Sequence, residues 1–105
     1  MEHLEFKHKN RGGEAKPTRR YCLCGVVASG NLEVMMEYNA DSGECVFLID
    51  TAAAGFHSSW QAVISDFMDR NRPSGLKVSI NDNAASPAVV SLRLDQTFEA
   101  LCGGE

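Results

Sequence analysis

Residues 56–81 read FHSSWQAVISDFMDRNRPSGLKVSIN, and this stretch decides the fold. Its apolar side chains recur at the i, i+4, i+7, i+8 spacing of one helical face. The members of this face are Phe56, Trp60, Val63, Ile64, Phe67 and Met68. We expect the helix to end at Arg72, because a residue before proline is pushed out of helical geometry. Beyond Gly75, residues 76–81 alternate apolar and polar side chains, which predicts a half-buried strand.

The start of this helix has two interpretations. Thr51 is a residue type that caps helices, so a helix could run through residues 52–54. Gly55 lowers helix propensity, however, and favours a later start. We therefore place the start near Phe56 and expect Trp60, with Phe56, Val63, Ile64 and Phe67, to form the contact between helix and sheet.

The residues before this helix have the features of three strands. Residues 21–28 are rich in apolar and β-branched side chains and lead into Ser29-Gly30-Asn31, which suits a tight turn. Residues 32–38 alternate partly between apolar and charged side chains. Residues 39–43, NADSG, are a second turn signal, and residues 44–50 form a third strand. Together they predict an antiparallel meander.

The residues after the strand at 76–81 predict a second helix. Ser86 is suited to cap it and Pro87 to occupy its first position. Val90, Leu94, Phe98 and Leu101 then follow at near four-residue steps, and Gly103-Gly104 ends the helix. The Val89-Val90 pair leaves a strand open for the first turns.

The order βββαβα predicts an α+β fold, with an antiparallel sheet of about four strands and two helices packed on one face.

Residues 1–20 are expected to form a flexible basic arm, or at most one frayed strand, ahead of a domain over residues 21–105. Six of the ten basic residues lie in the arm, which shows no sustained period. A solvated terminus is the simpler interpretation. The alternative is that the arm docks an acidic partner surface or the phosphates of a cofactor precursor.

Length and composition limit the function further. A chain of 105 residues, 44% hydrophobic, suits one globular core. Its longest apolar runs fall far short of the roughly 20 residues that cross a bilayer, and no signal core precedes them. We therefore expect a soluble, cytoplasmic protein. The net charge of -4 disfavours a nucleic-acid partner, because such binding draws on clustered Lys and Arg.

The four cysteines do not predict a metal site. Cys22, Cys24, Cys45 and Cys102 lack the paired C-x2-C spacing of zinc ligands. A cytoplasmic location also disfavours disulfides. Cys22 and Cys24 would face the same side of an extended segment, and free cysteine is among the most buried residue types, so we expect a core role for them.

The sequence offers few groups for catalysis. His3 and His8 lie in the arm, and a lone histidine such as His57 at a helix start is more often a packing or capping residue. No phosphate-binding Gly-rich loop, zinc-binding His-Glu-x-x-His or Gly-x-Ser-x-Gly elbow is present. A hydrolase using Ser29 would lack a base partner. We therefore expect no independent enzyme.

Ser29 alone would be explained as a turn residue, since Ser, Gly and Asn dominate turns. The longer pattern Gly25-Val26-Val27-x-Ser29-Gly30-x-Leu32-Glu33-Val34, however, resembles the segment around the modified serine of malonate decarboxylase acyl carrier proteins. Trp60-Gln61-Ala62 and the block Asp82-x-x-Ala85-x-Pro87-x-Val89-Val90-x-Leu92-Arg93-Leu94 resemble further parts of that family. The likeness spans roughly residues 21–101. This chain departs from the family at Asn31, where Asp is usual, and at Ala28, Ala85 and Ala88, where glycines are usual.

The resemblance implies a non-catalytic carrier. Ser29 would hold 2'-(5''-phosphoribosyl)-3'-dephospho-coenzyme A through a phosphodiester, with Gly30 and Asn31 as the flanking turn. The terminal thiol would carry acetyl or malonyl groups to the acyl transferase and decarboxylase subunits, and a prosthetic-group transferase would load it. The alternatives are the related citrate lyase acyl carrier protein and an unmodified structural or regulatory module.

Overall fold

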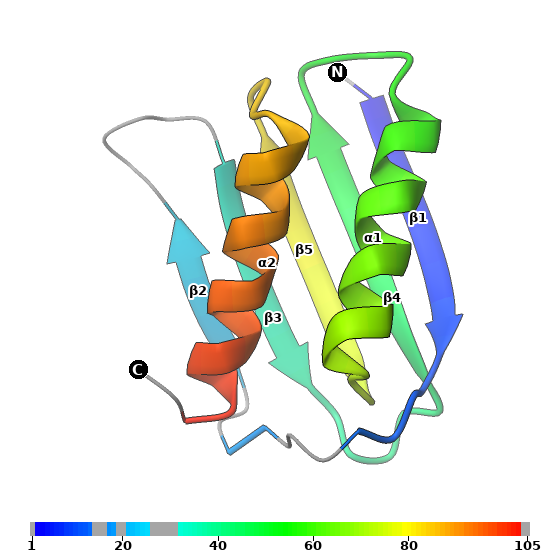
Figure 1. The fold of residues 1–105 in the computed structure, drawn as a ribbon, viewed down its shortest axis with the longest axis vertical. Coiled ribbons are helices and arrows are strands. Elements are labelled where there is room, and N and C mark those ends of the chain that lie inside the picture. Colours follow the sequence, from blue (N-terminus) through cyan, green and yellow to red (C-terminus); the bar gives the residue numbers. More distant parts are fainter. Residues whose placement is uncertain (1, 14–16, 19–20, 26–31, 104–105) are drawn as a thin grey trace.

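The computed structural model describes residues 2–13, 17–18, 21–25 and 32–103, with only the backbone of residues 21–25. Its elements are β1 (Glu2–Lys9), β2 (Tyr21–Gly25), β3 (Leu32–Tyr38), β4 (Glu44–Thr51), α1 (His57–Asn71), β5 (Leu76–Asp82) and α2 (Pro87–Leu101). Both helices lie side by side on one face of a single sheet (Figure 1). The α+β class, the order βββαβα from residue 21 onward and the placement of both helices are therefore confirmed.

The sheet is mixed, whereas the sequence predicted an antiparallel meander. The five strands lie in the order β1-β4-β5-β3-β2, and β4 pairs with β5 in parallel. β5 thus lies between β3 and β4, which do not pair with each other. The reason is the connection: α1 carries the chain back along the sheet, so β5 starts at the same end as β4.

The first residues form an edge strand, so the expected flexible arm is wrong for residues 2–13. β1 pairs with β4 from Glu2↔Thr51 to Lys9↔Glu44. Its inward positions are Leu4, Phe6 and His8, and charged side chains alternate with them. The abundance of charge hid this two-residue period.

Residues 10–13 continue from β1 and are fastened to the end of α1. The Arg11 N–H donates to the Pro73 carbonyl at 3.0 Å, and the Arg11 guanidinium meets Asp69 at 2.7 Å. The Gly75 N–H donates to Asn10 Oδ1 at 2.8 Å. Arg11 therefore serves the fold through an internal contact.

The core lies between the sheet and the helices. From α1 it takes Trp60, Ile64, Phe67 and Met68, and from α2 Val90, Leu94, Phe98 and Leu101. These are the faces that the spacing predicted, except that Phe56 is 51% exposed. Phe56 precedes the first helical residue, where the backbone has non-helical angles, so the periodicity of α1 does not apply to it.

The helix ends follow local signals. The Ser86 side chain accepts from the Val89 N–H, and Pro87 opens α2, as expected. The strand interpretation of its first turns is wrong. α1 ends at Asn71, and Arg72 adopts a left-handed conformation with φ of 48°, its N–H bonded to the Met68 carbonyl.

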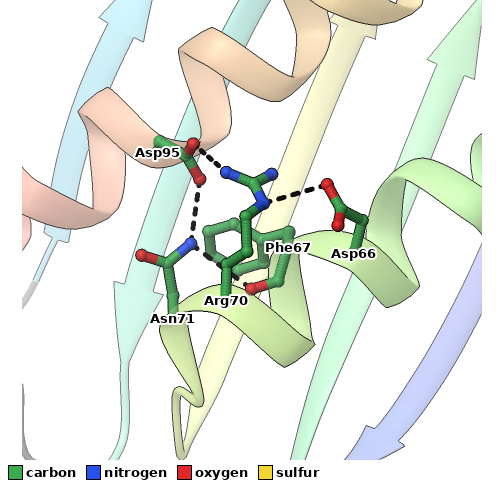
Figure 2. A network of polar contacts seen from close by, with 5 residues as sticks. All are labelled: Asp66, Phe67, Arg70, Asn71 and Asp95. Carbon is green, nitrogen blue, oxygen red and sulfur yellow. Dashed lines mark hydrogen bonds and ion pairs between the residues drawn. The ribbon is translucent and has the colours of Figure 1, made fainter.

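A polar network joins the last turn of α1 to the middle of α2 (Figure 2). The Arg70 Nε donates to Asp66 at 2.9 Å, and the Arg70 guanidinium also contacts Asp95. Asn71 Nδ2 donates to Asp95 at 2.8 Å. The hydrogen bond to Asp95 raises the pKa of Arg70. These contacts bridge α1 and α2 at this level.

Candidate functional site

Ser29, Gly30 and Asn31 lie outside the described residues, but both strands that flank them are placed. β2 and β3 are antiparallel neighbours, with Gly25 opposite Glu33. Leu32, the first residue of β3, lies opposite Asp82, the last residue of β5. Gly25 and Leu32, the described residues on either side of this segment, therefore lie at the end of the sheet where β5 finishes.

A buried polar cluster occupies this end of the sheet, where Asp82 also lies opposite Thr51 of β4. Asp82 is only 7% exposed. Its carboxylate accepts from the Thr51 hydroxyl at 2.8 Å and from the Ala85 N–H at 2.9 Å. The Thr51 Oγ1 in turn accepts from the Ala53 N–H at 3.1 Å. The cluster shapes both loops that lead into the helices.

A pocket of about 220 Å³ opens above this cluster, between the first turns of α1 and α2. It is lined by Thr51, Ala53, Phe56, Ser59, Trp60, Val63, Asp82, Ala84, Ala85, Pro87 and Val90. The carboxyl ends of parallel strands, and the amino ends of the helices that follow them, lie at the same edge of a sheet. The pocket lies at this edge, where β4 and β5 end and α1 and α2 begin.

The pocket walls are mainly apolar, and its polar atoms belong to few side chains. Small residues such as Ala53 and Ala85 leave the space, while Trp60 and Val63 contribute apolar lining. Such a pocket suits a slender, mostly apolar group, since polar groups that lose water need a hydrogen-bond partner.

The histidines with aromatic contacts have structural surroundings. His57 lies against Phe6 with ring centroids 5.0 Å apart, and His8 meets the edge of Phe47 at 6.0 Å. Burial lowers the pKa of His8, and the nearby Arg11 charge lowers it further. Neither histidine is among the residues that line the pocket.

The described cysteines are not activated nucleophiles. Cys45 is fully buried, and burial raises the pKa of its thiol. Burial also raises the pKa of Cys102. The side chains of Cys22 and Cys24 lie outside the described part of the structure. Within that part, no three His, Cys, Asp or Glu residues gather as metal ligands would. Neither described helix has the length and hydrophobicity of a membrane span.

The pocket was not predicted from the sequence, although Asp82 and Ala85 belong to the motif over residues 82–94. Four elements contribute to the pocket, and each supplies only a few small or apolar residues. The signal that could have found it is the parallel pairing of β4 and β5. No short-range pattern encodes that pairing.

Comparisons with known proteins agree with the arrangement. Residues 19–101 match the family described as Malonate decarboxylase delta subunit (MdcD). A malonate decarboxylase acyl carrier protein from Bradyrhizobium diazoefficiens is 50% identical over 101 residues, covering 96% of this chain and 95% of the relative. One from Stenotrophomonas maltophilia is 50% identical over 105 residues, covering 100% of this chain and 98% of the relative.

A solved structure shows the same fold. In the crystal structure of a Pseudomonas malonate decarboxylase hetero-tetramer in complex with malonate, one chain superposes with a TM-score of 0.79. It is 35% identical, and the match covers 96% of this chain and 99% of that chain. Both relatives match over nearly their whole length, and the family match spans most of the domain. The chain therefore belongs to the malonate decarboxylase acyl carrier protein family, described as the delta subunit.

Proposed function

We propose that this chain is the acyl carrier of a malonate decarboxylase and that Ser29 is its attachment point. The prosthetic group is 2'-(5''-phosphoribosyl)-3'-dephospho-coenzyme A, held through a phosphodiester. In the loading step the Ser29 Oγ bonds to phosphorus of an activated precursor, loses its proton and displaces the precursor's leaving group. When bound, the group supplies a thiol that carries acetyl or malonyl as a thioester.

One structural observation supports this most. The segment that contains Ser29 joins β2 to β3, and β2 is the outer strand beside β3 in the described sheet. An attachment point between such strands can project from the sheet without disturbing the core. Among the residues whose side chains the structure describes, the core residues that follow Ser29 most closely in the sequence are Leu32 and Val34, both in β3.

The chain's own part in the chemistry is to carry the acyl group and present it to the catalytic subunits. A tethered acyl group reaches several catalytic sites at a high effective concentration, which a dissolved thioester lacks. The partners are the acyl transferase and decarboxylase subunits, and a separate transferase loads the arm. The hetero-tetrameric assembly of the Pseudomonas structure supports a multi-subunit setting. A cytoplasmic location fits this role.

The test is intact-mass and peptide mass spectrometry after co-expression with the loading transferase and its precursor pathway. We expect one adduct, on Ser29, and none in the Ser29→Ala variant. Ser58→Ala is the matched control, because Ser58 is an exposed serine in the first turn of α1. It should be loaded as the unsubstituted chain is. An adduct on Ser42, Ser58 or Ser86 would refute the assignment.

Activity of the reconstituted complex provides the second measurement. The Ser29→Ala chain should fold normally and fail to support malonate turnover, and free coenzyme A thioester should rescue it poorly. Turnover at the unsubstituted rate would show that Ser29 carries nothing. If the chain never acquires the arm, it is an unmodified interaction module. Activity with citrate lyase subunits in place of malonate decarboxylase subunits would favour the related carrier.

A further inference from the structure

We propose that the pocket between α1 and α2 binds the acetyl-thioester end of the arm and prefers it to the malonyl form. This inference rests on the proposed function, since it assumes an arm on Ser29. The carrier would thus shelter one of its two cargoes. The pocket, its lining and its place relative to β3 support this.

An arm attached to Ser29 is long enough to reach the pocket. Leu32 pairs with Asp82, and Asp82 with Thr51, so the first residue of β3 is two strand spacings from the far wall of the pocket. Two spacings amount to about 10 Å. Ser29 is three residues from Leu32, a span of at most about 11 Å. An arm of phosphoribosyl, adenosine, pyrophosphate and pantetheine units in series extends beyond that distance and can fold back.

The shape and polarity of the pocket suit the acetyl-thioester end of the arm. The volume of about 220 Å³ suits a narrow chain end rather than a nucleotide, and Trp60 with Val63 offers it an apolar wall. Aliphatic thioester and acetyl methyl groups lose little on leaving water, and the burial of apolar surface is favourable. The phosphate-rich part of the arm would stay in solvent.

The charge of the pocket lining disfavours the carboxylate of a malonyl group. Asp82 contributes a carboxylate to the pocket, and the described lining contains no Lys or Arg to balance a second one. Both helix starts bear a partial positive charge, about half an elementary charge each. The first turns are exposed at Ser59 and Pro87, where water screens them. The full charge of buried Asp82 therefore outweighs them, and malonyl is disfavoured.

The consequence is different handling of the two cargoes. An acetyl thioester inside the pocket is shielded from water and from stray nucleophiles. A malonyl thioester stays outside, accessible to the decarboxylating subunit. The carrier would thus protect the acetyl thioester from hydrolysis and leave the malonyl thioester accessible for decarboxylation.

Trp60 is a built-in reporter, because it lines the pocket and is the one tryptophan in the chain. The loaded chain is prepared with a free thiol, an acetyl group or a malonyl group, and loading is verified by intact mass. We expect acetylation to shift the Trp60 emission and to move backbone amide resonances at Ala53, Val63 and Ala85. Malonylation should produce markedly smaller changes.

Thioester lifetime provides a functional measurement. We expect the acetyl thioester on the folded chain to react with hydroxylamine about threefold more slowly than on the urea-unfolded chain, corresponding to about two thirds occupancy of the pocket. Ala85→Leu fills the pocket and should remove this protection. Ala62→Leu makes the same change on the exposed face of α1 and should retain it. If Ala85→Leu does not fold, Ala53→Leu is the second variant, because Ala53 also lines the pocket.

The outcomes separate this inference from the proposed function. Absence of the arm from Ser29 would refute both. A loaded chain whose acetylation leaves Trp60 and the pocket amides unchanged would refute the pocket alone, and the carrier role would stand. Equal changes from acetyl and malonyl would refute the charge preference. Protection that persists in both filled variants would show that the thioester is sheltered elsewhere.

Discussion

The interface between α1 and α2 differs between its two ends. Near the last turn of α1, Arg70 and Asn71 reach Asp95 and bridge the helices with ion pairs and hydrogen bonds (Figure 2). Near the first turns the helices are separated by the pocket, whose walls include Ala84 and Ala85. One end of the interface is linked by polar side chains and the other is hollow.

This difference shows how a small carrier can hold an open pocket without losing its fold. The buried contacts of Phe67 with Phe47 and Phe98 lie toward the linked end, at ring separations of 6.0 and 5.9 Å. Such edge-to-face contacts add to the stability that burial already provides. The amino ends of α1 and α2 can therefore stay apart and leave room for the pocket, at the end of the sheet where β3 begins.

The largest expected effect is at the hollow end. Trp60→Ala should lower the free energy of unfolding by about 3–5 kcal/mol, because Trp60 is a buried aromatic that forms both core and pocket wall. Urea denaturation measures this loss. Phe56→Ala is the matched control, and since its ring is half exposed the loss should stay below about 1 kcal/mol. A loss below about 1 kcal/mol at Trp60 would mean that its ring does not contribute to the core.

The next effect tests the floor of the pocket. Asp82→Ala leaves the Thr51 hydroxyl and the Ala85 N–H without their acceptor, and an unsatisfied buried group costs about 1–3 kcal/mol. Thr51→Val removes the hydroxyl donor and so breaks the same Thr51–Asp82 hydrogen bond from its other partner. Their combined cost should fall short of the sum, because both changes remove one shared contact. Strict additivity in denaturation experiments would show that the two side chains do not interact.

The elements of this fold differ in how far sequence predicts them. The apolar face of α1 from Trp60 to Met68 follows the helical period, so the helix was predictable. For β1 the sequence left open at most one frayed strand, because its charged residues obscured the alternation of Leu4, Phe6 and His8. The parallel pairing of β4 with β5 was missed for a different reason. A two-residue period reports which side chains are buried but not which strand lies beside which.

The candidate site divides in the same way. Ser29 was found through a resemblance that covers a contiguous motif, and its modification stays a prediction. The pocket has no such motif, since Thr51 and Asp82 are 31 residues apart and meet only through strand pairing. Tertiary pairing, rather than any local pattern, creates the cavity.

A smaller effect is expected at the linked end. Asp95→Ala removes the acceptor shared by Arg70 and Asn71, and partly exposed ion pairs are worth about 0.2–1 kcal/mol. The loss should shrink in high salt, because solvent ions screen the pair. Glu99→Ala, an exposed acid one turn later in α2, is the control. A loss at Asp95 that is the same in low and high salt would show that charge is not its cause.

The smallest effect concerns His8, also at the linked end, where Arg11 and Asp69 are the charges that act on it. Burial lowers the pKa of His8 in the folded chain below the ordinary value of 6.5. The unfolded chain therefore takes up this proton first as the pH falls. The stability linked to neutral His8 is complete above about pH 6.5 and is lost as the pH falls toward the lower folded pKa.

His8→Gln should accordingly flatten the pH dependence of stability just below about pH 6.5, while the urea midpoint at pH 8 changes little. The measurement is a series of urea titrations between pH 8 and pH 5.5. The unsubstituted chain, titrated at the same pH values, is the reference. An unaltered slope in His8→Gln would assign the acid sensitivity to the carboxylates, whereas a flattened slope would show that β1 contributes to stability through a neutral histidine packed on Phe47.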